Sequence, residues 1–236
     1  MNISFLKNPI ILALDVDDQK TAFDHLKKLG HLIGAVKLGP RLVYRYGSEF
    51  VNVCAKTCPV FVDNKYFDIP STMVAAVQAS FDSGATLVTV HALSGSEALK
   101  QLADLEKKLN QIRPFKILAV TVLTSWDEKS FPPSFKALPV QDHVVGLANL
   151  VIESGLDGIV CSGHELNLLK DKNLYKVVPG IRFDLNTASN TDSNHDQKRV
   201  MSPKEALSSG AQALVIGRAL LQSKNPEKDI QDILNS

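Results

Sequence analysis

Eight short apolar segments, most of them rich in β-branched residues, recur along the whole chain and alternate with amphipathic stretches. The predicted strands are Ile10–Leu14, Ile33–Leu38, Pro59–Asp63, Thr86–Val90, Ile117–Val122, Gly158–Cys161, Val177–Pro179 and Leu214–Ile216. Most are continuous apolar runs, the pattern of parallel strands covered on both faces. The predicted helices include Gln19–Leu29, Ser71–Phe81, Gly95–Leu109, Gln141–Ser154 and Pro203–Ser208. Eight strands in alternation with helices favour a closed (β/α)₈ TIM barrel over an open sheet.

Glycine residues stand where predicted helices end and the next strands begin. Gly30, Gly84, Gly155 and Gly210 occupy such junctions, and we expect each to adopt the left-handed conformation of a helix cap. Three of these junctions share a Ser-Gly pair followed by an apolar residue, as a repeated βα unit would. Because no linker is visible, we expect residues 1–236 to form a single domain.

Two stretches lack apolar periodicity, and both follow a predicted strand. Residues 126–139 contain three prolines, and residues 183–199 are rich in Asn, Ser, Thr and Asp. Long loops of this kind in a compact domain are usually lids or disordered segments. Loops that follow the strands lie at the C-terminal mouth of such a barrel, where active sites are found. We therefore interpret both stretches as active-site lids.

The overall composition excludes several classes of function. The formal net charge is +1 and charged residues make up 22% of the chain, so there is no basic footprint for nucleic acid or for an anionic membrane. No apolar run approaches the length of a membrane span, and a cytoplasmic location is expected. Cys54, Cys58 and Cys161 do not suggest a disulfide framework, and no second Cys or His pair completes a metal site.

Functional side chains stand at or just beyond the C-terminal ends of the predicted strands, which a barrel brings to one face. These residues are Asp15, Lys37, Asp63, Lys65, His91, Thr124, Pro179, Arg182, Gly217 and Arg218. Charged groups at such positions are costly to bury unless they are paired or used. A single one would most often be structural, but several on one face indicate an active site.

The segment around the end of the third predicted strand carries the densest set of charges. Asp63 and Lys65 are two residues apart, so a strand points both side chains to the same side, which is the interior of a closed barrel. Asp68 lies past the strand end, where it can return to the same pocket or reach across a subunit interface. Carboxylates around one ammonium keep it protonated, so we interpret Lys65 as a proton donor rather than a nucleophile.

The last two predicted βα units end in residues suited to phosphate. In barrels, the loops after the seventh and eighth strands often bind phosphate through backbone N–H groups and a helix N-terminus. Gly217 allows a close approach of the backbone, and Arg182 and Arg218 supply forked donors that match phosphate oxygens. We therefore expect a small phosphorylated substrate.

The segment Asp63-x-Lys65-x-x-Asp68-Ile69-Pro70-x-Thr72 resembles the signature of the bacterial orotidine 5′-phosphate decarboxylase family. Further similar segments are Leu14-Asp15, Val36–Gly39, Val120–Ser125, Gly155–Ser162, Pro179–Arg182, Gln197-x-Arg199, Met201-x-Pro203 and Val215–Arg218. The resemblance covers essentially the whole chain. It implies a carboxy-lyase that converts orotidine 5′-phosphate to uridine 5′-phosphate without a cofactor or a metal, as the last step of pyrimidine synthesis.

The resemblance also implies a role for each matching residue. Lys37, Asp63, Lys65 and Asp68 would form a charged tetrad, in which Lys65 stabilises and then protonates the C6 carbanion left by carbon dioxide. Asp63 would lie near the departing carboxylate, and Asp68 would come from the partner subunit of a homodimer with shared active sites. The substrate-binding residues would be Asp15, Lys37 and Thr72 at the ribose, Thr124 and Ser125 at the pyrimidine, and Pro179, Arg182, Gln197, Gly217 and Arg218 around the phosphate.

Some positions near the signature depart from the family pattern. Asn64, Tyr66 and Phe67 stand where Leu, Phe and His are more common, and Ser71 stands where Asn is common. None of them belongs to the tetrad. These departures therefore concern the packing around the charged residues rather than the chemistry.

Other functions remain open. A metal-dependent sugar-phosphate decarboxylase or aldolase with a similar strand would place an acidic metal ligand at the end of the second strand, where this chain has Lys37. A Schiff-base aldolase would use Lys65 as a deprotonated nucleophile, but flanking aspartates favour the protonated form. A non-catalytic phosphoribosyl-ligand-binding protein should have lost part of the tetrad, and all its members are present.

Overall fold

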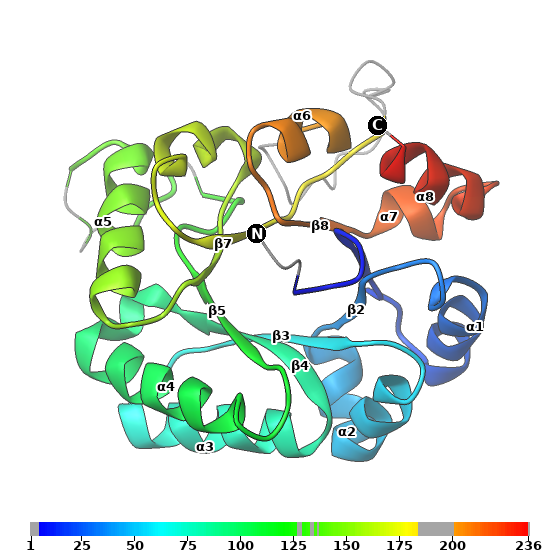
Figure 1. Ribbon diagram of the computed structural model, residues 1–236, viewed down its shortest axis with the longest axis horizontal. Coiled ribbons are helices and arrows are strands. Elements are labelled where there is room, and N and C mark those ends of the chain that lie inside the picture. The colour runs from blue at the N-terminus through cyan, green and yellow to red at the C-terminus, as the bar shows by residue number, and fades with distance from the viewer. Residues whose placement is uncertain (1–4, 127–128, 133–134, 136, 184–200, 236) are drawn as a thin grey trace.

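The computed structural model describes residues 5–126, 129–132, 135, 137–183 and 201–235, and within them the strands form a closed barrel (Figure 1). All neighbouring strands are parallel, and the first pairs with the last. The strands are β1 (Ile10–Ala13), β2 (Ala35–Leu38), β3 (Val60–Tyr66), β4 (Ala85–His91), β5 (Lys116–Val120), β6 (Gly158–Val160), β7 (Tyr175–Val178) and β8 (Ala213–Ile216). The predicted (β/α)₈ barrel is confirmed.

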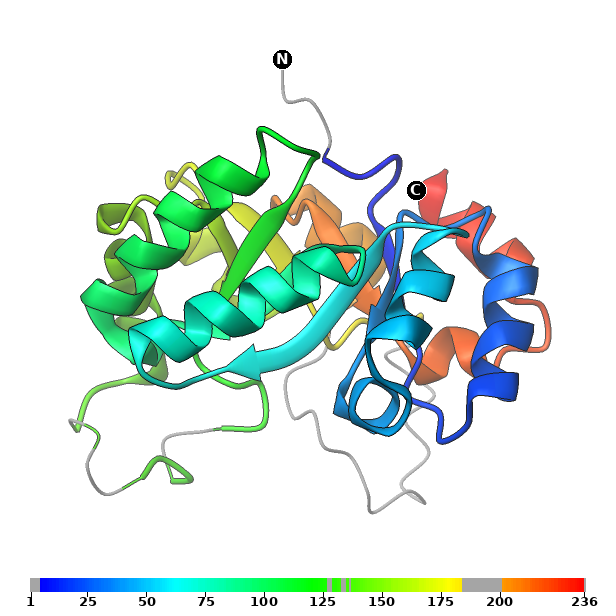
Figure 2. The same cartoon turned by 90° about the horizontal axis from the view of Figure 1, so that it is seen from below.

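Helices surround the barrel on its outer side (Figures 1 and 2). They are α1 (Gln19–Leu29), α2 (Pro40–Ala55), α3 (Pro70–Asp82), α4 (Gly95–Leu109), α5 (Val140–Glu153), α6 (Pro203–Ser208), α7 (Arg218–Leu221) and α8 (Pro226–Leu234), with short 3₁₀ turns at Ala92–Ser94, Gly163–Glu165 and Asn167–Leu169. The bounds of α1, α4 and α6 agree with those predicted from apolar spacing. Within the described ranges, no helix is both long enough and apolar enough to cross a bilayer.

Two apolar clusters hold the barrel together, one on each side of the strands. Because side chains alternate along a strand, β1 sends Ile10 and Leu12 toward the helices, and Ile11 and Ala13 into the barrel. The inner cluster includes Phe61, with Leu6 of the N-terminal segment also in it, and all these side chains are nearly inaccessible to solvent. The barrel interior is therefore packed, and the charged residues at the strand ends lie above an apolar floor.

The glycines at helix ends adopt the predicted conformation at three of the four junctions. Gly84, Gly155 and Gly210 have φ values of +102°, +88° and +97°, a region that favours glycine. The prediction was wrong for Gly30, whose φ of −59° is right-handed helical. A Cβ atom at Gly30 would lie 2.6 Å from the carbonyl oxygen of Leu26, so close packing rather than a left-handed turn requires glycine there.

The three cysteine side chains are buried and form no disulfide. Burial raises the pKa of the Cys54 thiol to about 12 and that of the Cys58 thiol to about 11. Both groups are therefore protonated at neutral pH, and they pack as small apolar side chains within the outer cluster, together with Cys161. This agrees with the interpretation of the cysteines from the sequence.

The carboxyl group of Glu106, on α4, is partly buried beside the N-terminal end of β5. Its Oε2 accepts a hydrogen bond from the backbone N–H of Ile117. Burial raises the pKa of this carboxyl to about 7, although the charge of Lys116 and the hydrogen bond from Ile117 act in the opposite direction. The folded protein therefore binds this proton more tightly than the unfolded chain does.

Glu106 is expected to make the stability of the fold depend on pH. Its folded pKa of about 7 lies above the ordinary 4.5, so its stabilising contribution is complete below pH 4.5 and is lost as pH rises through 7. The free energy of unfolding of Glu106→Gln should match that of the wild type near pH 4.5 and exceed it above pH 7 by ~2 kcal/mol, after discounting for solvent screening. Urea unfolding at a series of pH values measures this difference.

The matched control is Glu97→Gln, which removes an exposed carboxylate from the same helix. We expect this variant to follow the pH dependence of the wild type. A Glu106→Gln variant that also follows the wild type at every pH would contradict the prediction.

Candidate active site

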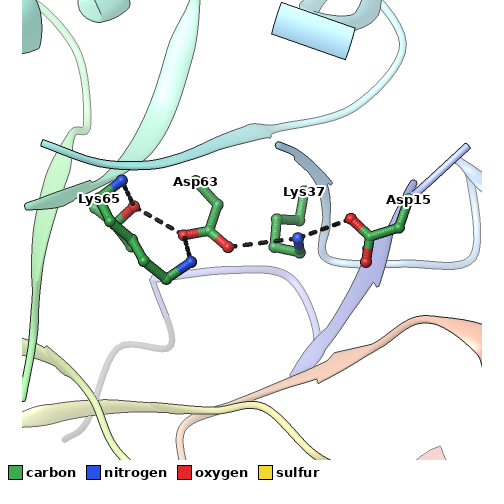
Figure 3. A network of polar contacts seen from close by, with 5 residues as sticks. Asp15, Lys37, Asp63 and Lys65 are labelled. Carbon is green, nitrogen blue, oxygen red and sulfur yellow. Dashed lines mark hydrogen bonds and ion pairs between the residues drawn. The ribbon is translucent and has the colours of Figure 1, made fainter. Parts of the chain in front are cut away.

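The C-terminal ends of β1, β2 and β3 bring four charged side chains into one row (Figure 3). Lys37 Nζ lies 3.2 Å from Asp15 Oδ1 and 3.4 Å from Asp63 Oδ2. Lys65 Nζ donates a hydrogen bond of 2.9 Å to Asp63 Oδ1. Negative and positive groups therefore alternate along the row, in the order Asp15, Lys37, Asp63, Lys65. We refer to these four residues as the charged row.

The two central members of the charged row are more buried than the two outer ones. Side-chain exposure is 11% for Lys37 and 12% for Asp63, against 54% for Asp15 and 40% for Lys65. Burial acts to raise the pKa of Asp63, but the charges of Lys37 and Lys65 outweigh it and the pKa is lowered. Burial acts to lower the pKa of Lys37, but Asp63 and Asp15 outweigh it and the pKa is raised. The central pair is therefore fully ionised at neutral pH.

Asp63 and Lys65 share one side of β3, as their spacing predicts. The strand continues past its predicted end at Asp63 and reaches Tyr66, so Lys65 is part of the strand rather than of the following loop. Lys65 has a φ of +48°, and no other non-glycine residue in the described part of the chain has a positive φ. Its backbone N–H donates a hydrogen bond to Thr89 Oγ1, a contact that was not predicted from the sequence.

A pocket opens between Lys65 and the ends of β5, β6 and β7. Its volume, including open space at the mouth, is about 260 Å³. The lining residues are Lys65, Val120, Val122, Leu123, Thr124, Val160, Cys161 and Pro179. Apart from Lys65 and Thr124, the lining residues are apolar or weakly polar, which suits a planar ring with one polar edge. Ser125, the other residue predicted at this ring, is exposed and is not among the residues that line the pocket.

His91 ends β4 and is buried near Lys65. Its Nδ1 accepts a hydrogen bond from the backbone N–H of Leu93, and its ring centroid lies 5.7 Å from that of Phe67. Burial, together with the charge of Lys65, lowers the pKa of the imidazole. His91 is therefore neutral at neutral pH, and it adds no positive charge to the site.

The residues predicted to bind phosphate lie at the ends of β7 and β8. A Cβ atom at Gly217 would lie 3.8 Å from Asp15 Oδ2, so the end of β8 adjoins the outer end of the charged row. Arg218 is exposed and begins α7. Arg182 follows β7 and is half-buried, and its backbone N–H donates to the carbonyl oxygen of Met201. Gln197 lies outside the described residues.

The described residues of the loop after β5 form an aromatic cluster. The Trp126 ring lies 5.8 Å from that of Phe131 and 5.6 Å from that of Phe135. Both phenylalanine rings also contact His143 of α5. The cluster attaches this part of the predicted lid at 126–139 to the body of the barrel. Of the predicted lid at 183–199, only residue 183 lies within the described residues.

Asp68 and Thr72 are not joined to the charged row by any hydrogen bond or ion pair within the described parts of the chain. Asp68 lies between β3 and α3, where its Oδ1 accepts a hydrogen bond of 2.7 Å from the backbone N–H of Ile69. Thr72 is exposed in the first turn of α3. The neighbours of Asp68 are apolar and open to solvent, since Phe67 is 62% exposed and Ile69 is 64% exposed.

Two of the departures from the family pattern contact each other on the outer side of β3. Asn64 Nδ2 donates a hydrogen bond of 3.0 Å to Tyr66 Oη, and Tyr66 Oη is 2.9 Å from Ser80 Oγ of α3. Asp63 and Lys65 point to the opposite side of the strand. The two replacements therefore bond to each other on the side of β3 away from the charged row, although the buried Asn64 Oδ1 has no hydrogen-bond partner among the described residues.

A (β/α)₈ barrel with a row of alternating charges and an apolar pocket at the C-terminal ends of its strands has the architecture of an enzyme for a small anionic molecule. The model of the orotidine 5′-phosphate decarboxylase / HUMPS family matches residues 8–233. This chain belongs to that family.

Similar proteins and structures extend over nearly the whole chain. The chain is 36% identical over 221 residues to the orotidine 5′-phosphate decarboxylase of Pseudoalteromonas atlantica, with coverage of 92% of this chain and 93% of that one. It is 38% identical over 231 residues to that of Erythrobacter litoralis, with coverage of 97% and 98%. The crystal structure of the decarboxylase from Lactobacillus acidophilus superposes with a TM-score of 0.82 at 30% identity, over 97% of this chain and 98% of that one. The resemblance identified in the sequence is confirmed.

Proposed function

We propose that this chain is a carboxy-lyase that converts orotidine 5′-phosphate to uridine 5′-phosphate and carbon dioxide, the last step of pyrimidine synthesis. The observation that carries the proposal is the position of the Lys65 ammonium. It is paired with Asp63 at 2.9 Å, and Lys65 is also one of the residues that line the apolar pocket. The relatives that are 36% and 38% identical over nearly the whole chain are named orotidine 5′-phosphate decarboxylases, which supports this substrate.

The reaction needs a positive charge in place before the bond breaks. When the bond from C6 to the carboxylate breaks, its electron pair stays on C6 in the plane of the ring and carbon dioxide leaves. A fixed ammonium beside C6 stabilises this carbanion without any reorganisation during the reaction. Lys65 then transfers a proton from Nζ to C6, and its side chain, 40% exposed, recovers a proton from solvent. No step of this sequence requires a metal or a cofactor.

Asp63 supports this chemistry from the centre of the charged row. Its hydrogen bond of 2.9 Å orients the Lys65 ammonium, and its second carboxylate oxygen is held by Lys37. A substrate carboxylate beside Asp63 meets a second negative charge, and this repulsion disappears when neutral carbon dioxide departs. Asp63 therefore orients the proton donor and also favours loss of the carboxylate.

The remaining predicted residues are proposed to hold the substrate along the mouth of the barrel. Thr124 would bind the polar edge of the pyrimidine, with Ser125 on the resemblance alone, and Asp15, Lys37 and Thr72 would bind the ribose hydroxyls. Pro179, Arg182, Gly217 and Arg218, with Gln197 on the resemblance alone, would surround the phosphate. Phosphate binding far from C6 can drive closure of lids at 126–139 and 183–199, so that its energy is expressed in the transition state.

We also propose a cytoplasmic homodimer in which each subunit supplies Asp68 to the active site of the other. Within its own chain, Asp68 is exposed between two exposed apolar side chains, Phe67 and Ile69. A second subunit that covers these side chains would bury apolar surface and bring the carboxylate to a neighbouring mouth. Residues 1–236 would then act as one domain of a symmetric pair.

The charged row also weighs against the alternative functions. A divalent cation would need Asp15 and Asp63 as ligands, but the Lys37 ammonium lies between them and repels a cation. A Schiff-base nucleophile must attack as a free amine, whereas Lys65 Nζ is held in an ion pair of 2.9 Å with Asp63. A protein that only binds a phosphoribosyl ligand has no need of a paired ammonium beside the ring.

The test is the loss of ultraviolet absorbance on adding orotidine 5′-phosphate to purified protein in excess EDTA, with uridine 5′-phosphate identified by chromatography. We expect rapid turnover that is unchanged when Mg²⁺ is restored. Absence of turnover, or turnover only after Mg²⁺ is restored, would refute the proposal and favour the metal-dependent sugar-phosphate reaction.

A further inference from the structure

The pairing between β3 and β4 is irregular at the point where the charged row begins. Val62 pairs with Val88, and the next pair is Tyr66 with Val90. Between these two pairs β3 has three residues, 63 to 65, whereas β4 has only Thr89. Such a bulge leaves backbone groups of the longer strand without partners in the ladder. Two inward-pointing side chains of β3, Asp63 and Lys65, therefore stand beside a single inward-pointing side chain of β4.

The hydroxyl of Thr89 takes the place of the missing ladder contacts. Its Oγ1 accepts a hydrogen bond of 2.9 Å from the backbone N–H of Lys65 and donates one of 2.8 Å to Asp63 Oδ1. Lys65 Nζ donates to the same carboxylate oxygen. Thr89 is completely buried, so water does not compete for these bonds. One hydroxyl thus connects the main chain of Lys65 to the carboxylate that orients its side chain.

The backbone of Lys65 needs this support because its φ of +48° lies in a region that residues with a Cβ atom rarely adopt. Such a conformation persists only where the surrounding contacts impose it. The left-handed turn determines where the Lys65 side chain leaves the strand. A change in this dihedral angle would therefore move Nζ relative to the pocket.

We propose that Thr89 is a positioning residue for the decarboxylation, which holds the Lys65 backbone in its left-handed conformation and fixes the carboxylate of Asp63. Thr89 acts through these two residues and does not touch the substrate. The kinetic consequence rests on the proposed function. The effect on the Lys65 backbone does not, because it requires no substrate.

The kinetic test compares Thr89→Val, which keeps the shape of the side chain but loses the hydroxyl, with Thr89→Ser, which keeps the hydroxyl. We expect kcat to fall roughly 10- to 100-fold in the valine variant, because the reacting groups are displaced. KM should change by less than ~3-fold, since the contacts to phosphate and ribose remain. The serine variant should restore kcat to within ~3-fold of the wild type.

The matched control is Thr121→Val. Thr121 is also completely buried at a strand end, but its hydroxyl donates to the backbone carbonyl of Val160 rather than to the charged row. This variant loses one buried hydrogen bond of a structural kind. We expect its kcat to remain close to that of the wild type even if its thermal stability is reduced.

The substrate-independent test is hydrogen exchange of the Lys65 amide, followed by NMR on the free protein. In Thr89→Val this N–H has lost its acceptor, and we expect its exchange to be faster by about tenfold or more. Exchange in Thr89→Ser and Thr121→Val should match the wild type. If Thr89→Val does not fold, Thr89→Cys tests the same expectations, because a thiol forms only weak hydrogen bonds.

The proposal is overturned if the hydroxyl-deficient variant retains the kcat of the wild type, if Thr121→Val loses as much, or if exchange of the Lys65 amide is unchanged. A wild-type protein without turnover would refute the proposed function instead. In that case the exchange comparison still decides whether Thr89 holds the Lys65 backbone.

Discussion

Replacement of Lys65 by alanine is expected to lower kcat by a factor on the order of 10⁴ or more, because one side chain supplies both the stabilising charge and the proton. Lys65 is the charged residue among those that line the pocket, and its ammonium is paired with Asp63 at 2.9 Å. Without it, the carbanion at C6 has neither a counter-charge nor a proton donor. The measurement is the rate of absorbance loss at saturating orotidine 5′-phosphate.

The variant Lys65→Arg separates the two contributions of this side chain. A guanidinium keeps the positive charge but gives up a proton far less readily than an ammonium. We expect Lys65→Arg to remain severely impaired, and Lys20→Ala, which removes an exposed lysine from α1, to behave as the wild type. Circular dichroism verifies that each variant is folded. A kcat of Lys65→Ala within tenfold of the wild type would contradict the assignment of Lys65 as the proton donor.

Much of the fold could be predicted because it depends on local patterns. The bounds of α1 follow from an apolar stripe and from Asp18, whose side chain caps the helix by accepting from the Thr21 N–H. Strand positions follow from continuous apolar runs, since both faces of each strand are covered. Gly30 shows the limit of this reasoning. Its neighbours in the sequence indicate a left-handed cap, but its backbone is right-handed, and a Cβ atom there would lie too close to Leu26 and Thr57.

The candidate site could be predicted where it depends on the spacing within one strand and on the closure of the barrel. The spacing of Asp63 and Lys65 predicts that both side chains face the barrel interior, although a bulge and the left-handed backbone of Lys65 interrupt the regular alternation there. The approach of Lys37 follows from the pairing of β2 with β3. The role of Thr89 could not be predicted in this way. It depends on a bulge between two strands, and no local pattern in either strand indicates that three residues will face one.

The largest effect that depends on a second subunit should come from Asp68. The variant Asp68→Ala is expected to lose activity by roughly 100-fold or more, as expected for a charged group of a preorganised site. Within its own chain this carboxylate is exposed and makes no ion pair among the described residues, so a loss of that size cannot come from the contacts visible in one subunit. Such a loss is the result expected if Asp68 acts on a site to which another subunit brings it.

Mixing two inactive variants tests this arrangement directly. In a heterodimer of Lys65→Ala and Asp68→Ala subunits with shared sites, one site carries both defects and the other carries neither. After unfolding and refolding of an equal mixture, random association makes half of the dimers heterodimers, and each heterodimer has one intact site of two. About a quarter of all sites are then intact, so about a quarter of wild-type activity should return. The dimer content is measured by native mass spectrometry.

The charged row provides the matched control for this experiment. Asp15 and Lys65 belong to one row within a single subunit, connected through Lys37 and Asp63. A mixture of Asp15→Ala and Lys65→Ala subunits therefore leaves every site with one defect, and no activity should return beyond that of the separate variants. Recovery in the Asp68 mixture alone would establish that Asp68 acts on the partner's site. Recovery in neither mixture, with heterodimers present, would place Asp68 in the site of its own subunit and contradict the shared arrangement.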